Sequence, residues 1–454
     1  MLPPSTSPPP FTSLPNLSSL RHPSSSSSRI VSPPPATTTT RVKITSSEMD
    51  SLPEHRIILG CGAAVVDFLA TVASYPKPDD KIRSTSLKVQ GGGNAGNALT
   101  CAARLGLNPR LISKVADDIQ GRGVLEELES DGVDTSYFCG ETIQDIVYLN
   151  HSFFHFDALL ICILLVVSKE GNSPFTYIIV DNETKTRTCI HTPGYPPMIP
   201  DELSRSSLLS ALNGAGLVYI DGRLHETALV IAQETARKNV PILIDAEKKR
   251  EGLDDLLPLA SYAVCSSKFS TEKASQVIYI EHLNCSWQAW TEAPSIPSAL
   301  VSMLLRLPKI KFVIVTLGED GCVMLERSTE EAPASEEKDA DSLWESLKQR
   351  KDDNIAIPTC YASPLTKIRA NGIGTVNGRM FVGTAEKIPP PELVDTTGAG
   401  DAFIGAVLYA ICANMPPEKM LPFASQVAAA GCRALGARTG LPHRTDPRLA
   451  AFLH

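Results

Sequence analysis

The chain has 454 residues, enough for one large core with an appendage or for two domains. Its 43% hydrophobic and 20% charged residues are typical of a globular protein and exclude a coiled coil, a collagen or a mucin. The formal charge of −8 leaves no basic excess to neutralise a polyphosphate. We therefore expect small ligands, and neither a nucleic acid nor a membrane, as partners.

The eleven cysteines are odd in number, and none lies in a CxxC pair. Cys61, Cys189 and Cys322 stand inside apolar runs. This pattern favours reduced, buried thiols over disulfides or a zinc site.

Residues 1–47 differ from the rest of the chain. They contain no Asp or Glu and four basic residues, are rich in Ser, Thr and Pro, and lack a long apolar stretch. This composition is typical of an organelle transit peptide, and we expect a plastid (chloroplast stroma) address. The alternative is an ordinary disordered tail on a cytoplasmic protein.

From Arg56 onward, short apolar runs alternate with segments of helical spacing. Such alternation predicts right-handed βαβ units and an α/β fold with a mainly parallel sheet between helices. The expected buried strands are Ile57–Cys61, Leu111–Val115, Leu217–Ile220, Pro241–Asp245, Tyr262–Cys265 and Phe312–Thr316. The expected helices between them include Asn94–Leu105, Gln120–Ser130 and Glu226–Lys238.

Three regions break this alternation. Residues 68–92 and 173–192 show the alternating pattern of exposed strands and predict a small separate sheet that could act as a lid. Residues 326–353 hold ten acidic and five basic residues and predict a solvated surface insertion with a short helix near Leu343–Leu347. If residues 139–166 were absent, the segment that follows them would join Phe138 directly and sensibly. These residues therefore indicate an anomalous insertion. The run of ten apolar residues that ends just after it, Ala158–Val167, is too short to span a bilayer.

The strongest chemical signal is the sequence from Asp395 to Phe403, DTTGAGDAF, followed by a predicted helix over Ile404–Cys412. Gly398 and Gly400 allow a tight turn whose amides can point together at a helix N-terminus, which favours an anion. Asp401 could cap the helix or remove a proton from an attacking hydroxyl. The spacing alone favours capping.

Two further glycine turns accompany this motif. Gly91–Asn97, GGGNAGN, opens a predicted helix, and its Asn94 and Asn97 side chains offer donors and acceptors that suit sugar hydroxyls. The alternative is a plain glycine hinge. Thr316–Gly321, TLGEDG, follows a buried strand, where such a turn often meets a nucleotide but is equally often a simple connection.

In their order along the chain and in their spacing, GGGNAGN, TLGEDG and DTTGAGDAF resemble the motifs of the ribokinase-like, or pfkB, family of carbohydrate kinases. The resemblance covers residues 56–445 and is closest in texture to ketohexokinase-type members, because Asp67, Tyr75–Pro76 and Ser266–Phe269 also match. It implies a ribokinase-like three-layer αβα sandwich with a mainly parallel sheet and a small β-sheet lid. It also implies transfer of the γ-phosphate of ATP to a hydroxyl of a small monosaccharide such as ribose, fructose or a related pentose or ketose.

The resemblance assigns roles to individual residues. Asp401 would be the catalytic base, which reverses the preference for capping, and Asp395 would lie near a monovalent cation such as K⁺. The amides of Gly398, Ala399 and Gly400 would form an anion hole. The sugar would be held by Asp67, Gly93, Asn94, Asn97 and Asp401. The nucleotide would be bound by Arg187, Thr316, Leu317, Gly318, Glu319 and Gly321.

Magnesium would arrive with ATP and be held mainly by phosphates and water, so we expect no protein metal site. The family's Asn-x-x-Glu stretch is not found at residues 265–271, which read CSSKFST. This departure weakens the expectation for how magnesium is handled.

Two other functions stay open. A nucleoside kinase of the same fold is the second hypothesis, although residues 68–92 offer only Phe68 and Tyr75 for stacking on a base. A catalytically silent, kinase-like plastid subunit is the third, and the intact Asp401 and GAG motif count against it. The open edges of the small sheet favour a homodimer formed through the lid.

Overall fold

The computed structural model describes residues 56–137, 167–168, 171–247, 250–267, 290–330 and 337–453. The expected leader at 1–47, the suspected insertion at 139–166 and Lys268–Thr271 lie outside the described residues. Within the described residues, no helix is long and apolar enough to cross a membrane.

Eleven of the described strands form one large, mainly parallel sheet in the order β14-β16-β17-β13-β12-β11-β10-β9-β1-β4, with β15 paired to β17. The strands are β1 Ile57–Cys61, β4 Asn108–Ile112, β9 Ala215–Ile220, β10 Ile242–Ala246, β11 Tyr262–Ser266, β12 Phe312–Thr316, β13 Cys322–Arg327, β14 Lys338–Asp339, β15 Cys360–Ala362, β16 Thr366–Ala370 and β17 Gly374–Gly383. Strands β4 to β12 along this order run parallel.

All six expected strands occur in this sheet, and five of them shift by two residues or fewer. The expected strand at Leu111–Val115 is wrong in its bounds. β4 starts earlier, at Asn108, and ends at Ile112, while Val115–Ala116 forms the separate short strand β5, which pairs with β6 (Val167–Ser168).

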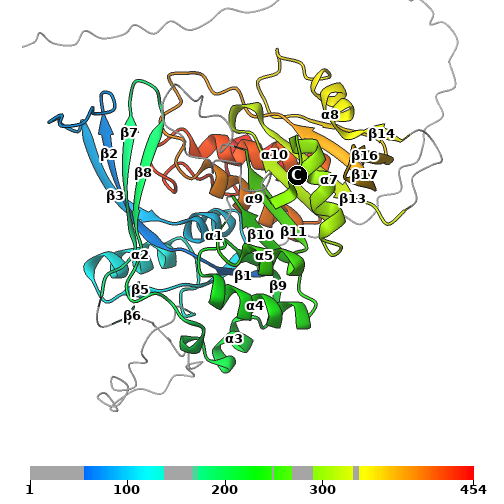
Figure 1. The fold of residues 1–454 in the computed structure, drawn as a ribbon. Helices are drawn as coiled ribbons and strands as arrows, with labels where there is room; N and C mark the ends of the chain where they lie inside the picture. Colours follow the sequence, from blue (N-terminus) through cyan, green and yellow to red (C-terminus); the bar gives the residue numbers. More distant parts are fainter. Residues whose placement is uncertain are drawn as a thin grey trace, which may run out of the picture. The chain divides into compact units, whose positions relative to one another are not determined.

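Helices cover both faces of the large sheet (Figure 1). α9 (Ala399–Cys412) packs against both α1 (Asn94–Arg104) and α10 (Pro417–Gly431), and α7 (Ile296–Arg306) packs on β12 and β17. The remaining described helices are α2 Ile119–Ser130, α3 Arg205–Ala211, α4 His225–Arg237, α5 Leu253–Leu256, α8 Ala340–Lys348 and α11 Ala450–Leu453. The expected αβα sandwich is confirmed.

A separate four-stranded sheet has the order β3-β2-β7-β8, as the alternating patterns predict. Its strands are β2 Val65–Val72, β3 Ser86–Gly92, β7 Phe175–Asp181 and β8 Arg187–Thr192. Leu69, Ile178 and Val180 form a buried cluster on one face with Leu435 of the C-terminal segment. Alternate residues on these strands point to the opposite face, so one face of the small sheet lies against the body of the protein.

The acidic stretch is more firmly packed than its composition predicts. α8 begins at Ala340, and its Leu343 and Leu347 side chains are buried in the main core. These leucines are spaced four apart and share one helix face, while the charged residues occupy the other. The expected short helix near Leu343–Leu347 is therefore present as α8, but its two leucines are buried in the core instead of solvated.

The cysteine prediction needs one correction. Cys61 and Cys322 are free and buried, as expected, but Cys189 is exposed. Cys189 lies on β8, an edge strand of the small sheet, and its apolar neighbours do not pack into the main core.

Candidate active site

The DTTGAG loop is fixed by the buried carboxylate of Asp395. One of its oxygens accepts hydrogen bonds from the backbone N–H and the hydroxyl of Thr397, at 2.9 and 2.7 Å. The other accepts the backbone N–H of Gly436, at 2.9 Å. A carboxylate has about four acceptor positions, so most of the capacity of Asp395 holds this loop to the C-terminal segment.

Helix α9 begins at Ala399, five residues before the expected helix. Gly398 occupies the N-cap position with a left-handed φ of 73°. Asp401 therefore lies in the first turn of the helix and is not its N-cap residue. A Cβ atom on Gly400 would meet no atom within 4 Å, so there is open space beside this turn.

The expected anion hole at Gly398, Ala399 and Gly400 stays a prediction. The helix N-terminus brings the amides of Ala399, Gly400 and Asp401 to one end of α9, where an anion is favoured. The Ala399 N–H already donates to the Thr396 carbonyl, although at a long 3.3 Å.

Asp401 is held from a distant part of the sequence. Its carboxylate accepts a hydrogen bond of 2.8 Å from the side-chain amide of Asn97 on α1. Gly405 allows this approach, because a Cβ atom there would collide with the Ala98 carbonyl and with Cys101. The two signature motifs, 304 residues apart at these positions, thus meet in one site.

Asn94 joins a second set of polar residues. Its amide nitrogen donates to Asp245 at 3.1 Å, and its oxygen accepts from the Arg223 guanidinium at 3.1 Å. Asp221 accepts the backbone N–H groups of Ala63 and Ala95, at 2.7 and 3.2 Å.

Sequence reasoning missed Asp221, Arg223 and Asp245. A usable signal existed, because Asp221 follows β9 directly and Asp245 lies near the end of β10. Ligands of open α/β sheets bind beyond the carboxyl ends of the parallel strands, where these residues stand.

Asp67 lies on β2, on the face of the small sheet that points toward the body, and is 4% exposed. A Cβ atom on Gly92 would overlap its carboxylate, so the glycine makes room for the acid. Gly93 adopts a left-handed φ of 88° immediately before α1 and lies close to the Ala63 carbonyl. The glycine motif therefore packs closely against Asp67 in addition to forming a turn.

Arg187, on β8, reaches from the small sheet to the DTTGAG loop. Its guanidinium donates to the Thr396 hydroxyl at 2.8 Å. On β3, Lys88 donates to the Leu435 carbonyl at 3.0 Å and to the Thr439 hydroxyl. The small sheet thus contacts both the DTTGAG loop and the C-terminal segment.

The Thr316–Gly321 turn is a compact structure at the end of β12. The Leu317 N–H donates to the Gly321 carbonyl at 2.7 Å, and the Thr316 hydroxyl donates to the Cys265 carbonyl at 3.2 Å. Gly321 has a φ of 91°, and a Cβ atom there would strike the backbone of Gly383 and Ala385. The contacts described here join this turn to the end of β17, whereas Asp67, Asn94, Asn97 and Asp401 belong to the α1 and α9 junction.

Three carboxyl groups around this junction hold protons more tightly than usual. Burial raises the pKa of Asp401 to about 8 against the opposing hydrogen bond from Asn97, and the carboxylates of Asp245 and Glu247 raise it further. Burial likewise raises the pKa of Asp245 and of Asp67 to about 7. A carboxylate with a pKa near the working pH can accept and release a proton during a reaction.

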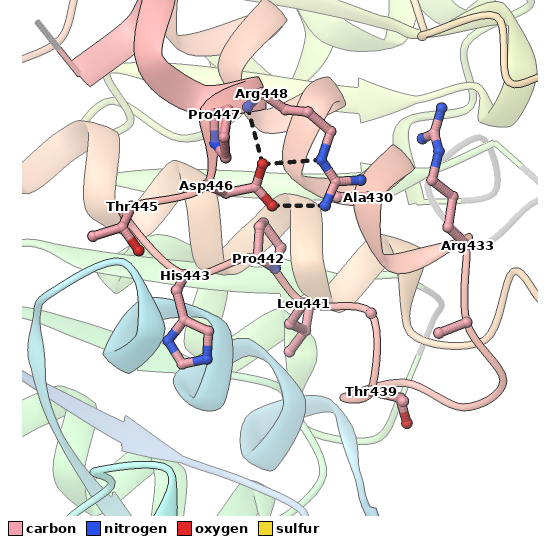
Figure 2. A pocket seen from close by; sticks show the side chains of 12 residues that line it. Ala430, Arg433, Thr439, Leu441, Pro442, His443, Thr445, Asp446, Pro447 and Arg448 are labelled. Carbon is pink, nitrogen blue, oxygen red and sulfur yellow. Dashed lines mark hydrogen bonds and ion pairs between the residues drawn. The ribbon is translucent and has the colours of Figure 1, made fainter. Parts of the chain in front are cut away.

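A cavity of about 460 Å³ lies elsewhere, along the C-terminal segment from Ala430 to Arg448 (Figure 2). Its cations are already paired: Arg433 contacts Glu386 and Glu392 at 2.8 Å each, and Arg448 contacts Asp446 at 2.6 Å. None of the expected site residues lines it. Among the described residues, no group of three or more His, Cys, Asp or Glu side chains could hold a metal ion.

Comparisons with known proteins find sequence and fold similarity to carbohydrate and nucleoside kinases. The family model described as "pfkB family carbohydrate kinase" matches residues 58–143 and 376–444, which contain both signature motifs. Ribokinase from Mus musculus is 22% identical over 404 residues, covering 88% of this chain and 96% of that protein. Ketohexokinase from Mus musculus is 21% identical over 391 residues, covering 84% and 98%.

Solved structures share the fold. The ribokinase of Arabidopsis thaliana, complexed with ribose and ATP, aligns with a TM-score of 0.54 at 17% identity, covering 86% of this chain and 96% of that one. The nucleoside kinase of Burkholderia thailandensis, in complex with inosine, gives a TM-score of 0.52 at 16% identity, covering 87% and 97%. The architecture is therefore that of the ribokinase-like kinases. The chain is thus similar in sequence to the pfkB family of carbohydrate kinases over residues 58–143 and 376–444.

The raised pKa of Asp401 predicts how stability depends on pH. An unfolded Asp titrates near about 4, whereas the folded group titrates at about 8. Between these values the folded protein keeps a proton that the unfolded chain has released, so the free energy of unfolding falls as pH rises through this window. Asp401→Asn lacks this titrating group, so this fall in the free energy of unfolding does not occur in the variant. Its melting temperature relative to the parent should therefore be higher at pH 9 than at pH 5.

Asp446→Asn is the matched control. The hydrogen bond from Arg448 holds the pKa of Asp446 below its ordinary value, so its contribution is already complete at pH 5 and stays constant up to pH 9. Thermal melts across this range measure both differences. An equally flat profile for the two variants would show that Asp401 titrates like an ordinary carboxyl.

Proposed function

We propose that the protein transfers the γ-phosphate of ATP to a hydroxyl of a small monosaccharide. The observation that supports this most strongly is the placement of Asp401. It stands in the first turn of α9, bonded to Asn97 of the other signature motif, with a pKa of about 8. A base with this pKa can take a proton from an alcohol near neutral pH.

In this reaction the sugar hydroxyl oxygen attacks the γ-phosphorus, the bond from phosphorus to the bridging β-phosphate oxygen breaks, and the hydroxyl proton passes to Asp401. ADP leaves with the electron pair of the broken bond. The N-terminus of α9, with Gly398, Ala399 and Gly400, stabilises charge on the transferred group through its amides and its dipole. Positioning and charge stabilisation supply most of the acceleration in phosphoryl transfer.

The sugar is held at the α1 and α9 junction in this scheme. Asn94 and Asn97 each have both ends of the amide engaged by protein groups. Their role is thus to orient the surrounding acids, and the hydroxyls bond mainly to the carboxylates of Asp67, Asp245 and Asp401. Gly93, which lies against the Ala63 carbonyl, forms the turn into α1 that places these residues beside the sugar in this scheme.

The nucleotide lies between the Thr316–Gly321 turn and the α9 N-terminus in this proposal. Leu317, Gly318 and Glu319 line it from the turn, and Arg187 reaches its phosphates from the small sheet. Magnesium arriving with ATP would supply positive charge that neutralises the phosphates there, and it would be held mainly by those phosphates and by water. A monovalent cation near Asp395 would use the acceptor capacity that its three hydrogen bonds leave.

A nucleoside is the competing substrate, since a nucleoside kinase shares the fold. The small sheet favours the sugar. Its aromatic residues Phe68, Phe175 and Tyr177 pack together, and Phe68 and Tyr177 alternate along their strands with Asp67 and Thr176 of the inward face. They therefore belong to the face opposite Asp67, where they are not placed to stack on a base. The retained Asp401 also counts against a silent subunit.

An ADP-release assay of the full chain tests this proposal against ribose, fructose, other pentoses and ketoses, and nucleosides. One monosaccharide should give clearly faster ADP release than any nucleoside. Asp401→Asn should lower kcat by about a hundredfold or more while leaving the KM for ATP nearly unchanged, because it keeps the shape and removes the base. Asp446→Asn is the control. A preferred nucleoside, or full activity of Asp401→Asn, would contradict the proposal.

We also propose a homodimer formed through the small sheet. β3 and β8 are its open edges, and Leu87, Val89, Tyr177 and Ile190 are 69%, 55%, 51% and 53% exposed. In the strand register, Val89, Phe68, Tyr177 and Ile190 form one apolar row across all four strands. Such a row on a monomer is a typical interaction surface.

Sedimentation equilibrium should give the mass of two chains for the parent and of one chain for Val89→Lys, because a charge in the apolar row opposes its burial. Lys77→Glu, on the exposed loop between β2 and β3, serves as the control and should stay dimeric. A parent with the mass of one chain would refute the dimer.

Residues 1–47 are proposed to direct the protein to the plastid stroma, on the strength of their acid-free, hydroxyl-rich composition. A fluorescent reporter fused behind these residues should accumulate in plastids. Cytoplasmic fluorescence from the same fusion would support the alternative of an ordinary tail.

A further inference from the structure

A fully buried arginine contacts Asn97, the residue that is hydrogen-bonded to Asp401. Arg438, in the C-terminal segment, is 2% exposed and is among the largest fully buried side chains. Its guanidinium donates from Nε to Asn97 Oδ1 at 3.0 Å and from Nη2 to the Gly92 carbonyl at 2.9 Å. Nη1 contacts Glu127 of α2 at 3.5 Å. Burying a charge costs hydration free energy, and only well-placed partners offset this cost.

The glycine motif makes room for this guanidinium. A Cβ atom on Gly91 would overlap Nη1 of Arg438, and one on Gly96 would overlap Nη2. Gly96 lies inside α1, where alanine would otherwise be more favourable than glycine. The space that these glycines leave is thus occupied by a protein side chain.

The arginine also decides which way Asn97 points. An amide side chain has one end that only accepts and one that only donates. Because Arg438 has only donors, Asn97 must turn its oxygen toward Arg438 and its nitrogen toward Asp401. Without Arg438, the amide could rotate and present its oxygen to the carboxylate, which would oppose ionisation of that carboxylate.

We infer that Arg438 is a positioning residue for Asp401, acting through Asn97: it fixes the amide so that Asp401 is oriented and kept ready to accept a proton. The inference rests on the proposed role of Asp401 as the base. Arg438 does not itself need to touch the sugar or the nucleotide.

The charges around both groups set the direction of the effect. Arg438 faces the acids Glu127, Asp131 and Asp67 and the cation Arg104. Asp401 faces Asn97, the acids Asp245 and Glu247 and the cation Arg223. Since none of the charged neighbours of Asp401 fixes the Asn97 amide, loss of Arg438 should raise the pKa of Asp401 and move the acid limb of the kcat profile to higher pH.

The test compares Arg438→Met, Arg438→Lys, Asn97→Ala and the double variant Arg438→Met with Asn97→Ala in the full chain. Arg327→Met is the matched control, because Arg327 is a partly buried arginine of β13 that donates to the carbonyls of Leu304, Leu307 and Ile310. The preferred sugar from the substrate panel is used, and kcat and KM are measured from pH 5 to pH 9.

Arg438→Met should lower kcat at pH 7 by about tenfold or more and shift its acid limb upward by about one pH unit, with a much smaller change in the KM for ATP. Arg438→Lys, which keeps the charge but has one donor nitrogen in place of three, should recover part of the loss. The double variant should be no worse than Asn97→Ala alone, because the two side chains act in one chain of hydrogen bonds. Arg327→Met should leave the pH profile unchanged.

Two further measurements keep the inference falsifiable. Gly96→Ala pushes against the guanidinium without deleting it and should shift the acid limb in the same direction. The second needs no substrate: Asp401→Asn should raise the melting temperature at pH 9, relative to pH 5, by more in the Arg438→Met background than in the parent.

The outcomes separate the two claims. Independent, multiplicative losses in the double variant with an unshifted acid limb would show that Arg438 only stabilises the fold, and would overturn the inference. If no compound of the panel is phosphorylated, the proposed function fails, and the melts still decide the coupling: an unchanged difference between backgrounds overturns it, and an enlarged one supports it.

Discussion

The candidate site depends on the contact between α1 and α9, and above all on the hydrogen bond from Asn97 to Asp401. The bond joins residues at opposite ends of the chain and brings two glycine-rich motifs into one place. Small residues make it possible, because Gly405 allows α9 to approach Ala98 and Cys101 closely. The small residues of this pattern are therefore needed for the close packing of α1 and α9 as much as for the chemistry of the site.

The C-terminal segment from Leu435 to Thr439 connects the parts of this site. Gly436 donates to Asp395 and holds the DTTGAG loop, Arg438 fixes Asn97, and Thr439 bonds to Gln90 of the small sheet at 3.0 Å. Leu435 packs against the small sheet's buried cluster. A movement of the small sheet would accordingly affect the positions of both the DTTGAG loop and Asp401.

Local sequence signals predicted most of the parallel strands, the small sheet and the residues of the two signature motifs, because periodicity and glycine turns are properties of short segments. They could not reveal Arg438, whose partners are more than 300 residues away. Two local details differ from the expectation: Gly398 starts α9 earlier than its apolar run indicates, and the expected helix near Leu343–Leu347 buries one face through these leucines.

In the proposed function, this ribokinase-like fold holds Asp401 as a base with an unusually high pKa. Carbon-13 NMR of the side-chain carboxyl groups, with Asp401 assigned by comparison with Asp401→Asn, measures this directly in the folded protein. The structure predicts a titration midpoint near 8 for that carboxyl. A midpoint near about 4, the ordinary value for aspartate, would contradict the account.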